Sequence, residues 1–458
     1  MTIMAEIKLK KGYYLRLEGE TFKAFENAPF PEKVACKPTD FTGLKPRLLV
    51  ETGDRVKVGT ALYKDKNNDD ILFTSPASGR VVDIVRGERR VIQEIVIETD
   101  GKQQRENIKI PRKSISSMNR GDIIPVLLRS GLFPLIIQRP FGKIADPRVT
   151  PRDIFISAMN TAPISPDWNL IVHGNEECFQ KGVDILSRLT DGKVHLAVDA
   201  RHGNLSRAFT AAEGVELHHI SGPHPAGNVG VHIHHIAPIR GRHDIVWTCS
   251  VQAVMCIGRL FMEGKLSPET IVTVAGSPAQ NRKYFRTIRG AQLSSFVEYF
   301  YDEDVRFISG DVFTGKKVSY DGFISFYDNM ITVIPEPAHY ELLGWTTLGA
   351  QKMSFSRTFL SYYLSRLLPR VRFEQKASLN GSKRAFIVTG IYEKVLPMDI
   401  YPVFLLKSIL AEDIEEMEGL GIYEVIEEDF ALCEYVDPSK NDFQELLRRG
   451  LDLIEREG

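Results

Sequence analysis

The strongest constraint on the fold is a regular alternation of short apolar runs and amphipathic segments that begins near residue 120. The apolar runs are rich in Val, Ile and Leu, as expected of strands that are buried on both faces of a sheet. Amphipathic segments at residues 179–189 and 206–212 have helical spacing. This alternation predicts βαβ units and a parallel sheet. The predicted strands are residues 153–158, 170–173, 194–198, 215–218 and 270–275.

This Rossmann-like layer lacks the loops that usually hold a dinucleotide. A pyrophosphate needs bare glycine backbone at the start of a helix, in runs such as G-x-G-x-x-G or G-x4-G-K-[ST]. Neither run occurs in the chain. We therefore expect no dinucleotide to bind at the strand ends in the usual way.

Residues 46–98 alternate short β-rich runs with glycine turns. The runs G-D-x-V-x-x-G at residues 53–59 and S-P-x-x-G-x-V at residues 75–81 resemble a biotinyl/lipoyl-type barrel-sandwich hybrid. In that family a lysine at a hairpin tip carries the prosthetic group. Here the matching position is Asn68, and Lys64 and Lys66 are out of register. We expect an unmodified structural sandwich, with a modified Lys66 as the alternative.

The rest of the chain divides into a β-rich part and a helical part. Residues 278–350 contain glycine turns between β-rich runs and resemble a β-grasp, soluble-ligand-binding module. Helical patterns return near residue 385 and end at residues 443–457. The predicted fold class is therefore multidomain α/β and β. The predicted domains are a barrel-sandwich hybrid at 1–105, a Rossmann-like α/β layer at 106–277, a β-grasp module at 278–350 and a C-terminal helical domain at 351–458.

The C-terminal helical domain resembles a degenerate ferredoxin fold. Residues 431–440 resemble an iron–sulfur run of the C-x2-C-x2-C-x3-C-P type, but only Cys433 is present and Asp437 precedes Pro438. Residues 396–402 stand where such proteins carry a Cys-Pro pair. With too few thiolates, no cluster is expected in this chain.

Composition excludes several functional classes. The chain has 58 basic and 59 acidic residues and a net charge of −1, so we expect no nucleic-acid partner. Its five cysteines form no C-x2-C pair, which fits a reducing compartment. We find neither an apolar signal region nor a run long enough to span a bilayer. Together these features favour a cytoplasmic location.

Four runs together resemble one family. Residues 221–235, which read SGPHPAGNVGVHIHH, are similar to the signature of the A subunit of the Na+-translocating NADH:quinone oxidoreductase. Residues 73–82, 257–261 and 344–345 support the match, and the domain order is similar to that of the C subunit of the Rnf complex and the NADH-binding flavoprotein subunit of complex I. The resemblance covers essentially the whole chain.

The resemblance implies a peripheral subunit on the cytoplasmic face of the bacterial inner membrane. Its partners would be the other subunits of the sodium-pumping complex, including integral membrane subunits, and NADH, flavins and iron–sulfur centres would be held by those partners. The assembly reduces a ubiquinone-type quinone and exports Na+, whereas the isolated chain would catalyse nothing. The alternatives are a stand-alone flavin or NADH oxidoreductase and a soluble ligand-binding scaffold.

The same comparison suggests a quinone site. Flavin-binding relatives carry a glycine-rich loop where this chain has a single glycine in residues 128–135, and Leu132 and Phe133 would fill the space. A quinone needs an apolar slot, an aromatic wall and donors for its carbonyl oxygens. The candidates beside the former flavin position are Phe133, Arg139, Phe141 and Lys143. The alternative is ordinary loop packing.

Two further clusters each allow a structural and a functional interpretation. His232 and His234 would share one face if residues 221–235 include a strand, with His224 nearby. A zinc site needs three or four ligands, so we predict no metal there, and a structural loop or a partner surface is the expected role. Arg282, Arg286 and Arg289 would form a basic stripe on a helix, as a solvated face or a docking face for a membrane subunit or anionic lipid.

Overall fold

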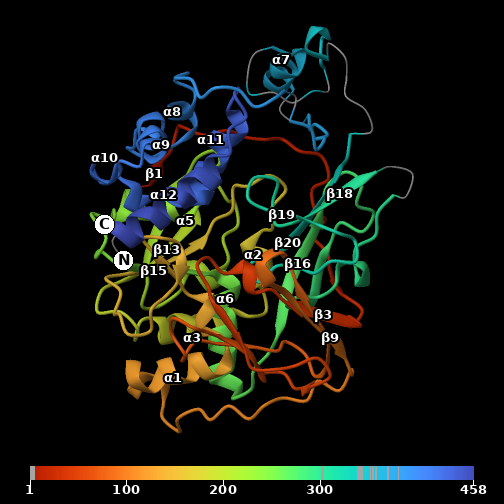
Figure 1. The fold of residues 1–458 in the computed structure, drawn as a ribbon, viewed down its shortest axis with the longest axis vertical. Coiled ribbons are helices and arrows are strands. Elements are labelled where there is room, and N and C mark those ends of the chain that lie inside the picture. Colours follow the sequence, from red (N-terminus) through yellow and green to blue (C-terminus); the bar gives the residue numbers. More distant parts are fainter. Residues whose placement is uncertain are drawn as a thin grey trace.

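The computed structural model describes residues 6–300, 304–337, 344–350, 352, 355, 358–368, 371–379 and 381–458. Figure 1 shows the N-terminal sheets and α1 (Arg120–Ser130) at one end of the molecule and the C-terminal helices at the other. Two larger sheets lie between them. In the part of the chain that the structure describes, no helix is both long and apolar enough to cross a membrane.

The N-terminal part folds into two small antiparallel sheets. One has the order β3-β9-β8-β5 and the other the order β4-β6-β7. Their core includes Leu62, Phe73 and Val81. Gly53 and Gly59 have φ of 104° and 94°, so the turn glycines of the sequence pattern occupy the left-handed region that favours glycine. The bounds are β3 Lys33–Cys36, β9 Ile92–Thr99, β8 Gly79–Arg86, β5 Arg55–Val56, β4 Pro46–Leu48, β6 Ala61–Asp65 and β7 Leu72–Thr74.

A seven-stranded sheet forms the middle of the molecule, in the order β1-β14-β13-β12-β15-β10-β11. Its first five strands in this order pair in parallel, and β10 and β11 add an antiparallel edge. The predicted parallel sheet is therefore confirmed. The bounds are β1 Ile7–Lys8, β14 Glu216–Ser221, β13 Val194–Asp199, β12 Ile154–Ala158, β15 Val246–Ser250, β10 Ile137–Arg139 and β11 Lys143–Ile144.

The two faces of this sheet bury different cores. Ile154 and Ile156 of β12 belong to the core that also contains α3 (Glu176–Leu186) and α6 (Val251–Glu263). Phe155, on the opposite face, belongs to a second core together with residues of α5 (Val229–Ile236) and the C-terminal helices. Successive side chains of β12 thus belong alternately to two separate hydrophobic clusters.

One predicted strand of this layer is wrong, and another lies in a different sheet. Residues 170–173 lie mostly in the helix α2 (Trp168–Val172), whose N-terminus is capped by the Asp167 side chain accepting from the N–H of Asn169 at 2.9 Å. A short apolar run is compatible with a buried strand and with a buried helix, and here the Asp167 cap stabilises the helix. Residues 270–275 are a strand, β16 (Glu269–Ala275), but in another sheet. The segment at 206–212 contains the short helix α4 (Arg207–Thr210).

A six-stranded sheet of mixed direction follows, in the order β19-β18-β20-β16-β17-β2. Its edge strand β2 comes from the N-terminal part and pairs in parallel with β17. The bounds are β19 Lys316–Val318, β18 Val305–Ser309, β20 Met330–Pro335, β17 Tyr284–Ile288 and β2 Phe25–Asn27.

The predicted arginine-bearing helix is wrong, because residues 284–288 form β17. The guanidinium of Arg282 lies 5.1 Å from the ring centre of Phe22, and that of Arg286 lies 4.9 Å from the ring centre of Phe25. The arginines therefore pack on aromatic rings of the N-terminal segment rather than forming a helical stripe.

The C-terminal part is helical, as predicted, and packs on the face of the seven-stranded sheet that α5 covers (Figure 1). In α12 the buried residues Phe443, Leu447, Leu451 and Ile454 recur at helical spacing along one face. A Cβ on Gly450 would lie 2.7 Å from Ile409, so α12 and α9 approach closely there. The bounds are α7 Leu360–Leu367, α8 Tyr392–Val395, α9 Pro402–Ala411, α10 Ile414–Gly419, α11 Glu427–Val436 and α12 Phe443–Glu457.

Candidate functional site

A pocket lies where the N-terminal sheets, the end of α1 and the six-stranded sheet meet. We call it the interdomain pocket. Its cavity volume is about 50 Å³, measured for the centre of a water-sized probe, and the surrounding empty space, open solvent included, is about 610 Å³. The residues that line it are Ala35, Cys36, Lys37, Asp40, Tyr63, Phe73, Thr74, Ser75, Pro76, Ser130, Gly131, Leu132, Leu266, Ser267, Pro268, Arg289, Gly290, Ile324 and Phe326.

One lining residue, Gly131, lies where α1 ends against the N-terminal sheets. Gly131 ends α1 with φ of 70°, and a Cβ there would lie 2.3 Å from Oγ1 of Thr74. A side chain at this position would therefore collide with β7 in addition to straining the backbone. The Thr74 hydroxyl donates to the carbonyl of Ser130 at 3.1 Å. These contacts hold the loop that follows α1 against the N-terminal sheets.

The pocket has an aromatic wall. The rings of Tyr63 and Phe73 stack with centroids 4.5 Å apart and an interplanar angle of 10°. Phe326 contributes a third ring and contacts Phe41, 4.8 Å away, which in turn contacts Phe73. Burial raises the pKa of the Cys36 thiol to about 12, so this lining residue is a neutral thiol at physiological pH.

Two cations and one carboxylate supply the charge in the pocket. The Arg289 guanidinium lies 5.3 Å from the ring centre of Phe326. The Lys37 ammonium donates to the carbonyl of Phe323 and lies 3.8 Å from a Glu94 oxygen. Asp40 accepts from the N–H of Phe326 at 2.8 Å. Hydrogen-bond donors and flat apolar surfaces therefore occur together in this pocket.

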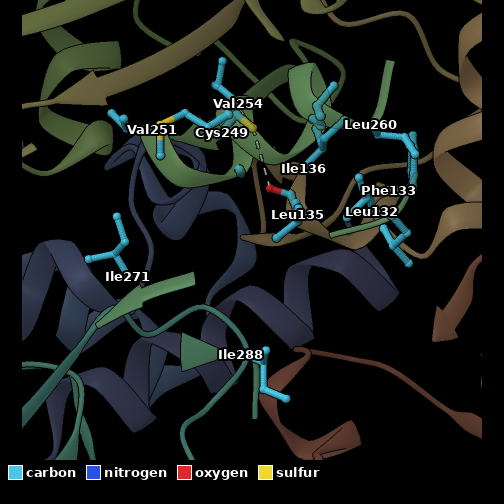
Figure 2. Close-up of a cluster of buried hydrophobic side chains, with 14 of the residues drawn as sticks. Leu132, Phe133, Leu135, Ile136, Cys249, Val251, Val254, Leu260, Ile271 and Ile288 are labelled. Carbon is cyan, nitrogen blue, oxygen red and sulfur yellow. Dashed lines mark hydrogen bonds between the residues drawn. The ribbon is translucent and has the colours of Figure 1, made fainter. Parts of the chain in front are cut away.

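Phe133 lies behind the pocket, in the hydrophobic core. It is fully buried and meets the Trp247 ring edge-on at 5.9 Å. Figure 2 shows Phe133 beside Leu132 and Ile136, and shows the Cys249 thiol directed at the carbonyl oxygen of Leu135, 3.9 Å away. The loop that resembles a flavin loop is therefore filled by apolar side chains.

Arg139 lies on the opposite side of the sheet region, against α11. Its Nη1 donates to Asp429 at 3.0 Å and its Nη2 to Glu428 at 2.6 Å. The Arg139 and Asp429 side chains are 2% and 0% exposed. A Cβ on Gly230 would lie 2.5 Å from Asp429, so the carboxylate fits against the start of α5. We call this set the Arg139–Asp429 contact.

Phe141 and Lys143 also face the C-terminal helices. The Phe141 ring meets Tyr423 edge-on at 6.0 Å, and its carbonyl accepts from Arg448 at 2.8 Å. Lys143 pairs with Glu455 and lies 3.9 Å from Asp452. The structure thus brings Arg139, Phe141 and Lys143 together on one side, whereas Phe133 belongs to the other hydrophobic core.

The histidines of residues 221–235 do not lie on a strand, because residues 229–236 form α5. His232 donates from Nε2 to the carbonyl of Ala226 at 2.8 Å. His234 pairs with Glu424 at 2.7 Å, and its other nitrogen accepts from the N–H of Asp399 at 3.0 Å. His232 and His234 therefore have different partners and do not share a ligand.

His224 lies apart from these two, before the helix. Its Nδ1 is 3.2 Å from the Thr161 hydroxyl, and its ring stacks on Phe313 at 4.8 Å. Burial lowers the pKa of both His224 and His232 to about 4, so both are neutral at physiological pH.

Asp437 stands where an iron–sulfur run would carry a cysteine ligand, and its carboxylate already accepts four hydrogen bonds. Asp437 is fully buried and accepts from the Tyr392 hydroxyl at 2.8 Å and the Ser439 N–H at 2.9 Å. Its second oxygen accepts from the N–H and the side-chain amide of Asn441 at 2.8 and 2.9 Å. Leu396 and Met398 of the companion run are buried in the helical core. Hydrogen bonds and apolar packing hold this region together.

Comparisons with known proteins place the whole chain. Residues 7–100 match the family model described as the NqrA N-terminal barrel-sandwich hybrid domain, and residues 118–266 match the NqrA second alpha/beta domain. Residues 271–320 match the NQRA C-terminal domain. The chain is 37% identical over 455 residues to the A subunit of Na(+)-translocating NADH-quinone reductase from Neisseria meningitidis serogroup B, covering 99% of this chain and 100% of the relative. It belongs to that family.

A second relative, the corresponding protein from Yersinia pestis bv. Antiqua, is 39% identical over 454 residues, with 99% of this chain and 100% of the relative covered. Among solved structures, an NAD+-reducing [NiFe]-hydrogenase matches with a TM-score of 0.35 and 11% identity, covering 68% of this chain and 60% of that one. The NqrA family assignment confirms the resemblance on which the sequence prediction rested, and the barrel-sandwich prediction for the N-terminal part is confirmed with it. The chain is therefore a subunit of an oxidoreductase assembly.

The interdomain pocket joins three regions that the NqrA family models match separately. Lys37, Tyr63 and Phe73 come from the first region, Leu132 from the second, and Arg289 from the third. From sequence, Arg289 was predicted on a helix, and Lys37 and Tyr63 had no predicted role. Their convergence depends on how the domains pack, for which no local sequence signal exists.

Proposed function

We propose that this NqrA-family chain is a peripheral, cofactor-free component on the cytoplasmic face of the membrane complex, and that it provides part of the quinone site. The names of its relatives assign them to a Na(+)-translocating NADH-quinone reductase. In this proposal NADH, flavins and iron–sulfur centres are held by partner subunits, integral membrane subunits among them. Electrons then reach a ubiquinone-type quinone, whose reduction drives Na+ export by the assembly.

The interdomain pocket is the observation that carries the quinone part of the proposal. A quinone ring is flat and apolar, and its two carbonyl oxygens accept hydrogen bonds. The Tyr63–Phe73 pair offers a flat surface, and Lys37 and Arg289 carry N–H groups beyond the ones that donate to Phe323 and Cys256. A cation beside a reduced quinone oxygen also stabilises the negative charge that develops during reduction.

The placement of the pocket fits the proposed site beside the former flavin loop. Leu132 of that loop lines the pocket, and Phe133 supports Leu132 from the core. Arg139, Phe141 and Lys143, the other predicted quinone contacts, lie away from this pocket and face the C-terminal helices. There the Arg139 donors to Glu428 and Asp429 are already paired within the chain. We therefore propose the interdomain pocket in their place as the quinone-contacting surface.

Two observations support the cofactor-free role. The Asp437 carboxylate is saturated by hydrogen bonds where related ferredoxin-type runs carry a thiolate. Leu132 and Phe133 fill the loop that flavin-binding relatives leave open. A purified chain that is yellow, with bound flavin, would contradict this part of the proposal and favour a stand-alone oxidoreductase.

The experiment that tests the subunit role measures Na+-stimulated NADH:quinone reduction in membranes from cells that lack this chain. We expect the activity to be lost and then recovered when the chain is restored. Copurification with several integral membrane chains should accompany recovery. Unchanged activity without the chain would reject the proposal and favour a scaffold or a separate ligand-binding protein.

A further inference from the structure

Three side chains that the proposed function does not use meet on one face of the seven-stranded sheet. In the parallel pair β13–β14, His195 lies opposite Glu216 and Ala197 lies opposite His218. Residues two apart on a strand project to the same face, so His195, Glu216 and His218 form a compact triangle. The stacking of Phe155 on His195, with ring centroids 4.5 Å apart, identifies this as the face that joins the C-terminal core.

The ligand atoms of this trio are already close together. Nδ1 of His195 lies 2.9 Å from Nε2 of His218 and 3.3 Å from Oε2 of Glu216. One ligand atom from each residue can be chosen so that all three lie within 4.8 Å of one another. Donor atoms around a four-coordinate zinc are about 3.4 Å apart, given metal–ligand bonds of about 2.1 Å. Small side-chain rotations therefore suffice to direct three ligands at one ion.

A carboxylate supports the trio from behind. Oδ1 of Asp153 lies 3.7 Å from Nε2 of His195, the ring nitrogen that faces away from His218. Metal-binding histidines commonly donate their second nitrogen to a carboxylate, which orients the ring, and a shift of a few tenths of an ångström would bring Asp153 to hydrogen-bond distance. Asp153 is held in turn by the Lys193 N–H at 2.9 Å and by Arg152 at 2.9 Å.

We propose that His195, Glu216 and His218 bind one divalent transition-metal ion, with Zn2+ as the best fit. Two imidazoles and one carboxylate suit zinc and similar metals, whereas Mg2+ and Ca2+ prefer oxygen ligands. His195 and His218 are each 5% exposed, and the Glu216 side chain is 21% exposed. The open side at Glu216 leaves room for water as a fourth ligand.

The ion would tie two neighbouring strands together near their amino ends. β14 also pairs with β1, so the site would stabilise the edge that carries the N-terminal strand. Lys193 lies 3.1 Å from the Glu216 carboxylate and competes with the ion for it, but its side chain is 64% exposed and can turn to solvent. This inference does not depend on the quinone proposal.

The test is a zinc titration of the full-length chain, with any affinity tag removed, after treatment with a chelator. Zn2+ is added in competition with a chromophoric chelator, and Co2+ is added separately to record its visible spectrum. We expect one Zn2+ per chain, a Co2+ spectrum typical of four-coordinate nitrogen and oxygen ligation, and a thermal midpoint that rises with Zn2+. No stoichiometric binding would overturn the proposal.

Variants assign the binding to the trio. His218→Gln and Glu216→Gln should abolish stoichiometric binding and the zinc-dependent rise of the midpoint, and Asp153→Asn should weaken binding by about tenfold. His219→Gln is the matched control, because His219 follows in the same strand and projects to the other face. Circular dichroism checks that each variant is folded, and Glu216→Gln, at a partly exposed position, is the mildest change. Binding that survives both ligand substitutions would overturn the proposal.

Discussion

The interdomain pocket and the Arg139–Asp429 contact each contain an arginine, yet they differ in what the guanidinium contacts. At the contact, two carboxylates of α11 accept from Arg139, and the Arg139 and Asp429 side chains are buried whereas that of Glu428 is 36% exposed. In the pocket, Arg289 lies over an aromatic ring and the space beside it opens to solvent. Residue types alone made the region around Arg139 the better quinone candidate. The distribution of charge favours the interdomain pocket.

Arg139→Met should give the largest effect, because it leaves the Asp429 carboxylate buried without its partner. Breaking a buried ion pair from one side costs about 3–5 kcal/mol, so we expect a loss of about 4 kcal/mol in the free energy of unfolding in urea. Arg148→Met is the matched control, since the Arg148 side chain is 76% exposed in its pair with Asp146. The double variant with Asp429→Leu should recover part of the loss. If Arg139→Met left the free energy of unfolding unchanged, the buried ion pair between Arg139 and Asp429 would be contradicted.

Asp437→Ala should be next, with a loss of about 3 kcal/mol. The change removes the acceptor of the Tyr392 hydroxyl and of the backbone N–H groups of Ser439 and Asn441. Each buried donor left unpaired costs about 1–3 kcal/mol, and water reaching the site would reduce the sum. The measurement is urea unfolding, with Asp452→Ala as the control at a half-exposed carboxylate. A loss no larger than that of the control would contradict the structural role of Asp437.

The pH dependence of stability should reveal the buried His232. Burial lowers its folded-state pKa from 6.5 to about 4, so its contribution is present above pH 6.5 and is lost as the pH falls towards 4. For this group alone we expect a loss of about 2 kcal/mol between pH 7 and pH 5. Urea unfolding of His232→Asn across this range should show a shallower slope than the unchanged chain, with His173→Asn as an exposed control. Identical slopes would contradict the assignment.

Changes in the interdomain pocket should have the smallest effect on stability and a selective effect on function. Arg289→Gln removes a charged donor near the proposed quinone oxygens. In the assembled complex we expect the KM for a short-chain ubiquinone to rise by about tenfold, equivalent to about 1.4 kcal/mol, with the KM for NADH unchanged. Arg286→Gln is the control, since Arg286 packs on Phe25 and does not line the pocket. Equal effects on both KM values would count against a quinone role.

The parts of the fold that sequence predicted correctly are those with a long or repeated local signal. The helical pattern at residues 443–457 predicted α12, and the glycines of the N-terminal turns predicted the sandwich. The errors fell on short segments. In residues 229–236 the alternation of His232 and His234 imitated a strand, although the segment is helical and packs against the C-terminal domain. Strand β16 was found, but its sheet depends on pairing with distant residues.

The candidate sites were harder to predict for the same reason. The pocket joins residues such as Lys37, Leu132 and Arg289, which are far apart in sequence. His195 and His218 both lay in correctly predicted strands, but only the register of β13 against β14 brings them together. A sequence pattern gives the face on which a side chain lies and leaves its neighbour on the next strand open.

The most direct test of the central claim is photo-crosslinking of the assembled complex with a photoreactive short-chain ubiquinone, followed by mapping of the labelled peptides. The account predicts label within residues 63–76, 130–132 or 323–326 of this chain, reduced by excess unlabelled ubiquinone and by Arg289→Gln. Label confined to other subunits, or found in this chain only along α11 and α12, would contradict the assignment of the quinone to the interdomain pocket.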